Sequence, residues 1–213
     1  MLLKYLREFN FRFKPIYMLK LKYTLFFTFS ILIFSCSSVD KVEFIILQLN
    51  DVYEIAPLEG GKVAGIARVA TLRNQLIEEN SNVFTTLSGD FVSPSLIGTL
   101  RFQDERIAGK QMVDVMNALG VDIVVPGNHE FDIKENEIQQ RINESEFEWT
   151  TTNVFHAVNG KVEPWKKNGE AFPDHILKTV DGVDIAFFGS TLPSNRKDYV
   201  AYSDVYQSVK NTY

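Results

Sequence analysis

The sequence predicts an α/β domain with a largely buried sheet. Three apolar segments of strand length, residues 43–49, 82–88 and 121–125, alternate with segments whose apolar residues recur at helical spacing. A polar loop follows each of these strand-like segments directly. Repeated strand–loop–helix units are typical of α/β folds. The composition is 45% hydrophobic and 23% charged, which is ordinary for a globular protein and excludes a disordered or low-complexity chain.

The first strand is expected at residues 43–49, EFIILQL. This near-continuous apolar run is typical of a strand that is buried on both faces of a sheet. A polar, glycine-rich loop follows it. The next apolar residues recur at intervals of three and four, which predicts a helix that ends in the polar run 78–82: Ile66, Val69, Leu72 and Leu76.

The second and third strands are expected at residues 82–88 and 121–125. Between them, helical spacing recurs at Met112, Val115, Met116 and Leu119. Gly120 follows this helix directly and is expected to stop it, because glycine readily adopts the left-handed conformation that ends many helices.

Three further elements are expected after the third strand. The charged stretch 134–147 is interpreted as a helix with a solvated face, and residues 148–154, EWTTTNV, are a candidate fourth strand. Residues 175–189 predict a β-hairpin around Asp181-Gly182, because an Asp-Gly pair favours a tight two-residue turn.

The first 36 residues are typical of an export signal. They hold six basic side chains and one acidic one, and an apolar run, TLFFTFSILIFS, leads to Cys36. That run is shorter than the roughly 18 residues of a membrane span, although a short anchor that stays attached is the alternative. Met18 opens a compact signal by itself and is an alternative start. We divide the chain into a signal (1–36), a linker (37–42) and a domain (43–213).

Cys36 is the single cysteine of the chain, so no internal disulfide can form. The segment ILIFSCSS resembles the lipobox of bacterial lipoproteins, in which the cysteine is lipidated and becomes the mature N-terminus. This resemblance implies an exported protein, anchored through Cys36 to a membrane of the bacterial cell envelope.

Charge argues against nucleic acid as a partner. Residues 37–213 keep 16 of the 22 Lys and Arg side chains and 26 of the 27 Asp and Glu side chains, a net charge of −10. Such a surface repels a phosphate backbone, so no nucleic-acid binding is expected. A phosphate-bearing substrate would need local positive charge from another source, and metal ions are one such source.

Polar side chains follow the three predicted strands where each strand ends. Asp51, Asp90 and Asn128 offer hard oxygen ligands, which suit Mg, Mn, Ca or Zn. His129 lies next to the amide and could act as a general acid, and Asp132 could orient its ring and favour the charged form. Ligands of open α/β sheets bind at the carboxyl ends of the strands, so the sequence predicts one site there.

Together these motifs resemble the calcineurin-like metallophosphoesterase superfamily, and within it the 5′-nucleotidase branch. The segments LQLNDVYE, LSGDFVSPS and PGNHEFD are similar to its three motifs, and IAFFGSTLPSN is similar to the segment that follows them. The resemblance runs from about residue 43 to the end of the chain. It implies a layered β-sandwich flanked by helices, and a hydrolase that cleaves phosphoesters, most directly nucleotides.

The resemblance also implies a role for each residue. Asp51 would bind a first metal ion, Asp90 would bridge two, and Asn128 would bind the second and contact the phosphate. His129 would protonate the leaving oxygen with Asp132 behind it. The two divalent ions (Mn, Zn, Mg, Fe or Ca) would lie about 4 Å apart and activate the attacking water.

The chain departs from the family's pattern at two points. Tyr53 stands where the first motif carries a histidine ligand, so Tyr53 is either a weak metal ligand or a residue that supports one. The family also carries further histidine motifs downstream. His156 and His175 do not lie in such motifs, so we expect a truncated domain. A non-catalytic envelope lipoprotein that keeps the fold is therefore the alternative function. Other phosphoesters also remain open as substrates, and Glu130 is expected to be structural.

Overall fold

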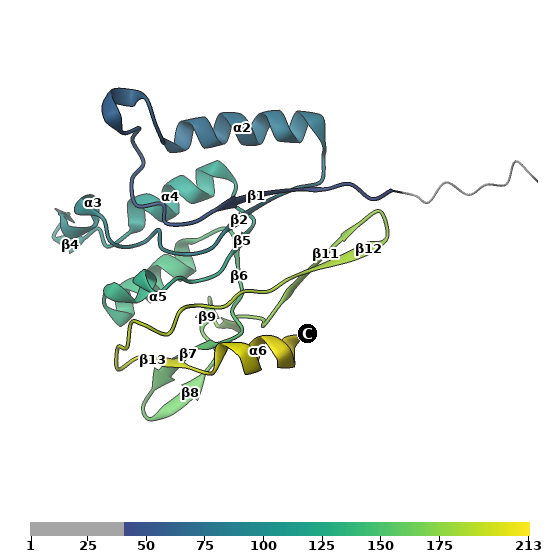
Figure 1. Ribbon diagram of the computed structural model, residues 1–213. Coiled ribbons are helices and arrows are strands. Elements are labelled where there is room, and N and C mark those ends of the chain that lie inside the picture. The colour runs from purple at the N-terminus through teal and green to yellow at the C-terminus, as the bar shows by residue number, and fades with distance from the viewer. Residues whose placement is uncertain (1–40) are drawn as a thin grey trace, which may run out of the picture. The chain divides into compact units, whose positions relative to one another are not determined.

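The computed structural model describes residues 41–213, and its framework is a four-stranded parallel sheet (Figure 1). The strand order is β1-β2-β5-β6, and every neighbouring pair runs parallel. The bounds are Ile45–Leu49 for β1, Val83–Leu87 for β2, Ile123–Val124 for β5 and Glu148–Trp149 for β6. The first three strands lie within the segments that the sequence predicts.

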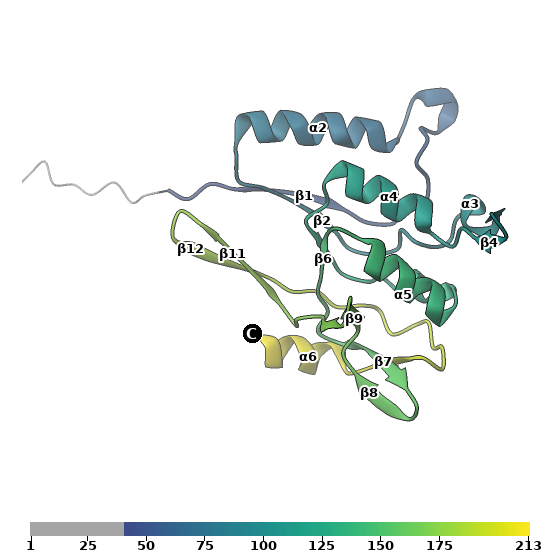
Figure 2. The same ribbon diagram turned by 180° about the vertical axis from the view of Figure 1, so that it is seen from behind.

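Three helices connect these strands in turn. They are α2 (Ile66–Glu79), α4 (Lys110–Leu119) and α5 (Glu135–Glu144). Figure 1 shows them stacked in a row beside the sheet, and Figure 2 shows the same row from behind. Gly120 ends α4 in a left-handed conformation at φ 76°, as the sequence predicts.

The core lies where these helices meet the sheet. Met112, Val113 and Met116 of α4 are fully buried, and Leu87 of β2 is buried among them. An aromatic cluster continues this core toward β6, where Phe91 and Phe147 both pack against Trp149. Because α4 is the central helix, its apolar face is the most completely covered.

A β-hairpin lies on the opposite face of the sheet. It pairs β11 (Ile176–Val180) with β12 (Val183–Phe187), and its turn is Asp181-Gly182, both at positive φ. The ring of Phe187 contacts that of Phe84 in β2 at a centroid distance of 5.3 Å. The predicted hairpin is therefore confirmed. The molecule has the predicted mixed α/β layering, with helices on one face of the sheet and further strands on the other.

The expectation that the first strand is buried on both faces is wrong. Residues of β1 alternate between half-buried and exposed, and Ile46 is 48% exposed. The reason is position, because β1 is an edge strand of its sheet and pairs with β2 on one side.

The predicted strand at 148–154 is divided between two sheets. Only β6 joins the parallel sheet, whereas Val154 opens β7 (Val154–Val158) of a three-stranded antiparallel sheet with the order β13-β7-β8. Between them, the N–H of Thr151 donates to Pro173 and the N–H of Thr152 donates to Gly189. These bonds lead the backbone away from the parallel sheet after Trp149.

The charged stretch 134–147 forms α5, which is not simply a solvated helix. Ile138 and Ile142 are buried, and so are Glu137 and Arg141. The Arg141 guanidinium donates to the carbonyls of Ile107 and Ala108, which explains how this charged side chain is accommodated in the interior.

The remaining elements are short. They are η1 (Glu59–Gly61), α3 (Leu96–Thr99), β3 (Arg101–Phe102), β4 (Glu105–Arg106), β8 (Lys161–Glu163), β9 (Lys166–Lys167), β10 (Glu170–Ala171), β13 (Val200–Tyr202) and α6 (Val205–Thr212). Within residues 41–213 no helix combines the length and apolarity that crossing a membrane requires. The predicted signal, its Cys36 and most of the predicted linker lie outside the described residues.

Candidate active site

The predicted site residues meet at the carboxyl edge of the parallel sheet. Asp51 follows β1, Asp90 follows β2 and His129 follows β5. The N–H of Asp51 donates to the carbonyl of Gly89 at 3.2 Å, which joins the first two loops. Asp51 and Asp90 both have left-handed backbones, at φ 54° and 58°, a conformation that aspartate tolerates better than most residues.

Glu130 holds the second and third loops together from inside. Its side chain is fully buried, and its two carboxylate oxygens accept the backbone N–H groups of Asp90, Phe91, Val92 and Gly127 at 2.5–3.1 Å. Burial raises the pKa of the Glu130 carboxyl, and these backbone donors act against that rise. The expectation that Glu130 is structural and bonds nearby backbone is confirmed.

Two glycines let the same loops touch. A Cβ added to Gly89 would overlap the backbone nitrogen of Gly127, and one added to Gly127 would overlap Oδ1 of Asp90. Gly89 also has a positive φ of 73°. Only glycine at both positions allows Asp90 to lie against the third loop.

His129 is held by two carboxylates. It begins the short helical turn η2 (His129–Asp132), and its backbone N–H donates to Oδ1 of Asp90 at 2.8 Å. Its ring Nδ1 lies 2.7 Å from Oδ2 of Asp132. The hydrogen bond to Asp132 raises the pKa of His129 despite partial burial. With Nδ1 engaged in this way, Nε2 is the ring nitrogen that can face a substrate.

Asn195 is a site residue that the sequence did not reveal. Its side-chain amide donates to Oδ1 of Asp132 at 2.6 Å and to the backbone carbonyl of Asn128 at 3.0 Å. It therefore fixes Asp132 and the residue before His129 at the same time. The segment that carries it, GSTLPSN, stood out in the sequence, but no single residue in it carried a signal of this role.

Asp51 and Asp90 differ in their electrostatics. Hydrogen bonds from Asn50 and from the Tyr53 hydroxyl, at 2.7 and 2.8 Å, lower the pKa of Asp51. Burial raises the pKa of Asp90, and the negative charge of Asp51 adds to that rise. Burial together with the bond to Asp51 raises the pKa of Tyr53, so it stays a neutral phenol.

These residues fit a hard divalent cation by ligand type. Asp51 and Asp90 bring two carboxylates into one electrostatic neighbourhood, where a cation would relieve their repulsion. Asn128 lies between Gly127 and His129, whose backbones are tied to Glu130 and Asp90. Among residues 41–213 no group of three His, Cys, Asp or Glu side chains is placed to hold a metal ion. The described residues thus supply part of a ligand set.

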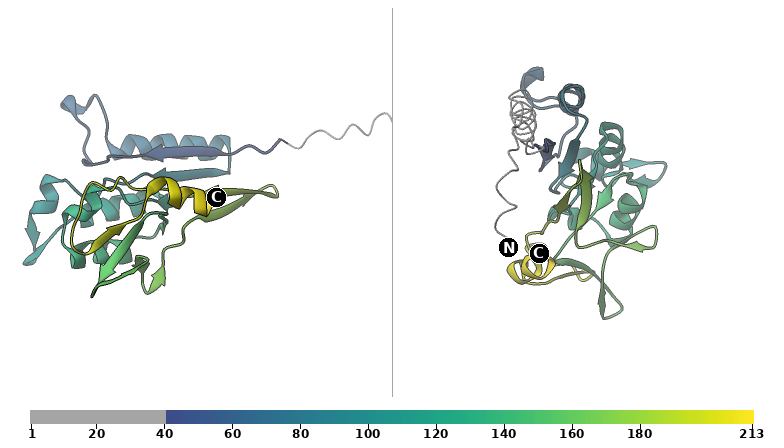
Figure 3. Two further views of the ribbon diagram at one scale, coloured as in Figure 1. Left: turned by 60° about the horizontal axis from the view of Figure 1, so that its bottom comes forward. Right: turned by 90° about the vertical axis from the view of Figure 1, so that its right-hand side faces the viewer.

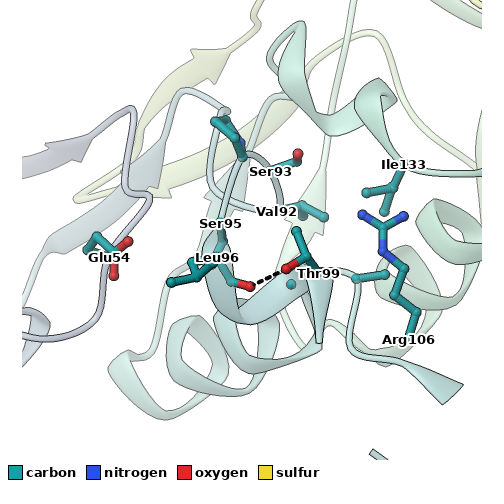
Figure 4. A pocket seen from close by; sticks show the side chains of 11 residues that line it. Glu54, Val92, Ser93, Ser95, Leu96, Thr99, Arg106 and Ile133 are labelled. Carbon is teal, nitrogen blue, oxygen red and sulfur yellow. Dashed lines mark hydrogen bonds between the residues drawn. The ribbon is translucent and has the colours of Figure 1, made fainter. Parts of the chain in front are cut away.

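A cavity of about 340 Å³ opens beside this cluster (Figure 4). Loops that carry site residues contribute Glu54, Val92 and Ile133 to its wall. Figure 4 shows Glu54 and Arg106 at opposite sides of the cavity. The Arg106 guanidinium lies 3.3 Å from the Glu137 carboxylate. Among the described residues that line this cavity, Arg106 is the cation.

Comparison with known proteins identifies the family of this chain. The family model described as "Calcineurin-like phosphoesterase" matches residues 44–208. The chain belongs to the calcineurin-like phosphoesterase family. The sequence resemblance to this superfamily is thereby confirmed.

Relatives within the phosphoesterases extend the comparison. An uncharacterized metallophosphoesterase, YunD of Bacillus subtilis (strain 168), is 31% identical over 120 residues, which is 53% of this chain and 24% of that protein. The 5′-nucleotidase precursor of Thermus thermophilus is structurally similar, with a TM-score of 0.64 and 23% identity over 78% of this chain. The NAD nucleotidase NadN of Haemophilus influenzae has a TM-score of 0.65 and 22% identity, also over 78% of this chain. At these identities the two structures show a common fold.

The phosphoesterase chain spans only part of these relatives. It covers 33% of the Thermus structure and 34% of the Haemophilus structure. The two remaining histidines of the chain lie outside the Asp51–Asp90–His129 cluster. His156 stacks on Trp165 and contacts Glu135, and His175 contacts Asp174.

Proposed function

We propose that this site hydrolyses phosphoesters, most directly nucleotides, with two divalent metal ions. One observation carries the proposal: two carboxylates, Asp51 and Asp90, meet the paired side chains of His129 and Asp132 at one edge of the sheet, with His129 bonded to Asp90 through its backbone. Membership of the phosphoesterase family and the fold shared with two nucleotidases support it.

The chain's own residues would divide the work as follows. Asp51, Asp90 and Asn128 would hold the metal ions. When bound, such ions neutralise phosphate charge and make a nucleophile available at neutral pH. His129 would hold a proton at Nε2 for the leaving oxygen, and Asp132 and Asn195 would fix the ring. The organic part of the substrate would enter the cavity beside Arg106.

A matched pair of histidine variants tests the proposal. His129→Gln should reduce phosphate release from a nucleotide by about 10²–10⁴-fold, the usual contribution of a general acid. His175→Gln is the control, since His175 has the same side-chain exposure, 40%, and the same 2.7 Å contact with an aspartate. Equal activity of the two variants, measured with added Mn²⁺ or Zn²⁺, would overturn the role of His129.

A second candidate function is a non-catalytic envelope lipoprotein that keeps the fold. Tyr53 favours it, because its hydroxyl donates to the Asp51 carboxylate from a position where the family carries a metal ligand. Measuring the metal content of the full chain after loading separates the two. Two tightly bound ions support the enzyme, and none under any loading condition supports the second candidate.

We also propose that the protein is exported and anchored through a lipid on Cys36. The support is the basic start, the short apolar run and the lipobox-like ILIFSCSS. An anchored phosphoesterase would meet its substrates in the bacterial cell envelope.

A further inference from the structure

A second cavity, of about 410 Å³, is lined by residues of β7, of α6 and of the segment 164–174. Figures 1 and 3 show the ribbons of β7 and α6. It shares no lining residue with the Asp51–Asp90–His129 cluster or with the Arg106 cavity. Its volume is within the range of small-molecule sites.

The floor of this cavity carries polar atoms that lack a partner. Trp165 is 1% exposed and Thr151 is 8% exposed, and both line the cavity. Among residues 41–213, neither Trp165 Nε1 nor Thr151 Oγ1 has a hydrogen-bond partner. Buried polar groups are nearly always hydrogen-bonded, so Trp165 Nε1 and Thr151 Oγ1 are candidate partners for a bound molecule. The other tryptophan of the chain differs, because Trp149 Nε1 donates to Ser145 at 2.8 Å.

The opposite wall is a polar stripe on α6 and on the two residues that precede it, called the α6 stripe. Residues spaced by four lie on one face of a helix, and two such series line the cavity: Ser203, Gln207 and Asn211, and Asp204, Ser208 and Thr212. Hydroxyl and amide groups therefore border this cavity, on a helix that has no buried residue. Val154 and Phe172 supply an apolar part of the floor.

The charge of the lining narrows the class of ligand. Among the described residues that line it, Asp174 and Asp204 are the charged ones, and none is a lysine or an arginine. A phosphate group would meet repulsion from these carboxylates. An uncharged molecule with many hydroxyl groups would instead find hydrogen-bond donors and acceptors on the wall. One of its oxygens could also accept from the Trp165 N–H.

We propose that this cavity binds an uncharged polyhydroxylated ring of pentose or hexose size, either as a free sugar or as the sugar of a nucleoside. The ring's oxygens would accept from Trp165 Nε1 and exchange hydrogen bonds with Thr151 and the α6 stripe. The proposal does not depend on phosphoester hydrolysis at the other site.

Indole N–H signals in ¹H–¹⁵N NMR of the full chain test this proposal. The chain has two tryptophans, so two indole signals are expected, assigned with Trp149→Phe. Titration with D-ribose, D-glucose or adenosine should shift the Trp165 signal to saturation and leave that of Trp149 in place. A preference for adenosine over ribose identifies a nucleoside as the ligand, and equal or tighter binding of the free sugars identifies a sugar. Ribose 5-phosphate should bind at least about tenfold more weakly than ribose.

Three variants make the test specific. Thr151→Val keeps the shape of the floor and removes its hydroxyl, and Gln207→Ala with Asn211→Ala removes exposed amides of the α6 stripe. Each change should weaken binding by about five- to tenfold, the weight of one or two hydrogen bonds. Lys210→Ala, on α6 outside the cavity lining, should have no effect. No saturable shift of Trp165 with any probe, equal shifts of both tryptophans, or unchanged affinity in the lining variants would overturn the proposal.

Discussion

Tyr53 is the residue that most separates this site from its family's pattern. Its hydroxyl donates to Oδ1 of Asp51 at 2.8 Å, and its pKa is raised, so it engages the carboxylate as a neutral donor. A carboxylate oxygen has two lone pairs, so this bond uses one of them and leaves the other open to a metal ion. In this structure Tyr53 acts as a hydrogen-bond donor that supports Asp51.

A substitution at this position should restore metal affinity. Tyr53→His replaces a phenol by an imidazole, a far better ligand for Zn²⁺ or Mn²⁺. We expect tighter binding of the first ion by about tenfold or more, measured by calorimetric titration. Tyr53→Phe is the control, because it removes the hydrogen bond to Asp51 without adding a ligand. Identical affinities for Tyr53→His and the unaltered protein would show that position 53 does not face the metal.

The His129–Asp132 pair sets a pH dependence. The bond to Asp132 raises the pKa of His129, so the ring keeps its proton to higher pH than a free histidine. If the protonated ring serves the leaving oxygen, activity falls as pH rises through this pKa. Asp132→Asn removes the charge and lowers the pKa, so the alkaline limb of the kcat profile should move to lower pH.

Asn195 provides the comparison for that experiment. Asn195→Ala removes the amide that holds Oδ1 of Asp132 but keeps the Asp132 charge. It should lower kcat through a looser ring and shift the alkaline limb less than Asp132→Asn does. A profile that is the same in all three proteins would contradict a role for His129 as the acid.

At the level of elements, one buried carboxylate joins the loops that follow β2 and β5. Glu130 accepts four backbone N–H groups, three from residues 90–92 and one from Gly127. A carboxylate suits this place because it has acceptor oxygens alone and carries no donor that would face an N–H. The arrangement links the position of Asp90 to the turn that carries His129.

Glu130→Gln should therefore destabilise the fold. The amide nitrogen would face backbone N–H groups and leave them unpaired in the interior, at a cost of about 2–4 kcal/mol in the free energy of unfolding. The control is Glu135→Gln, since Glu135 is a half-exposed glutamate whose bond to His156 should contribute less than about 1 kcal/mol. Urea denaturation of both variants measures the difference. Equal midpoints would mean that Glu130 does not hold the loops.

At the scale of the whole molecule, the proposed attachment to a membrane would depend on Cys36, which precedes the described residues. Cys36→Ser should abolish lipid attachment and move the protein from the membrane fraction to the soluble envelope fraction. Labelling with a radioactive fatty acid, followed by detergent partition, measures both effects. A variant that stays in the membrane fraction without label would instead indicate that the apolar run 24–35 is retained as an anchor.

The sequence by itself determined the alternation of strands and helices, the hairpin turn at Asp181-Gly182 and the placement of Asp51, Asp90 and His129 at strand ends. These features follow from local rules: side-chain periods of two and 3.6 residues, the conformational preference of glycine, and the shared carboxyl edge of parallel strands. Family motifs in the same loops indicated the chemistry.

Only the tertiary structure decided which residues complete the site and which faces are buried. Asn195 reaches Asp132 across 63 positions of sequence, and Arg141 is buried because carbonyls of a distant loop accept from it. Ile46 is exposed because its strand lies at the sheet's edge, and the run after Trp149 leaves the parallel sheet because its N–H groups find partners elsewhere. Local patterns give each segment its shape. A hydrogen-bond partner or a covering surface comes from another part of the chain, and packing alone brings the two together.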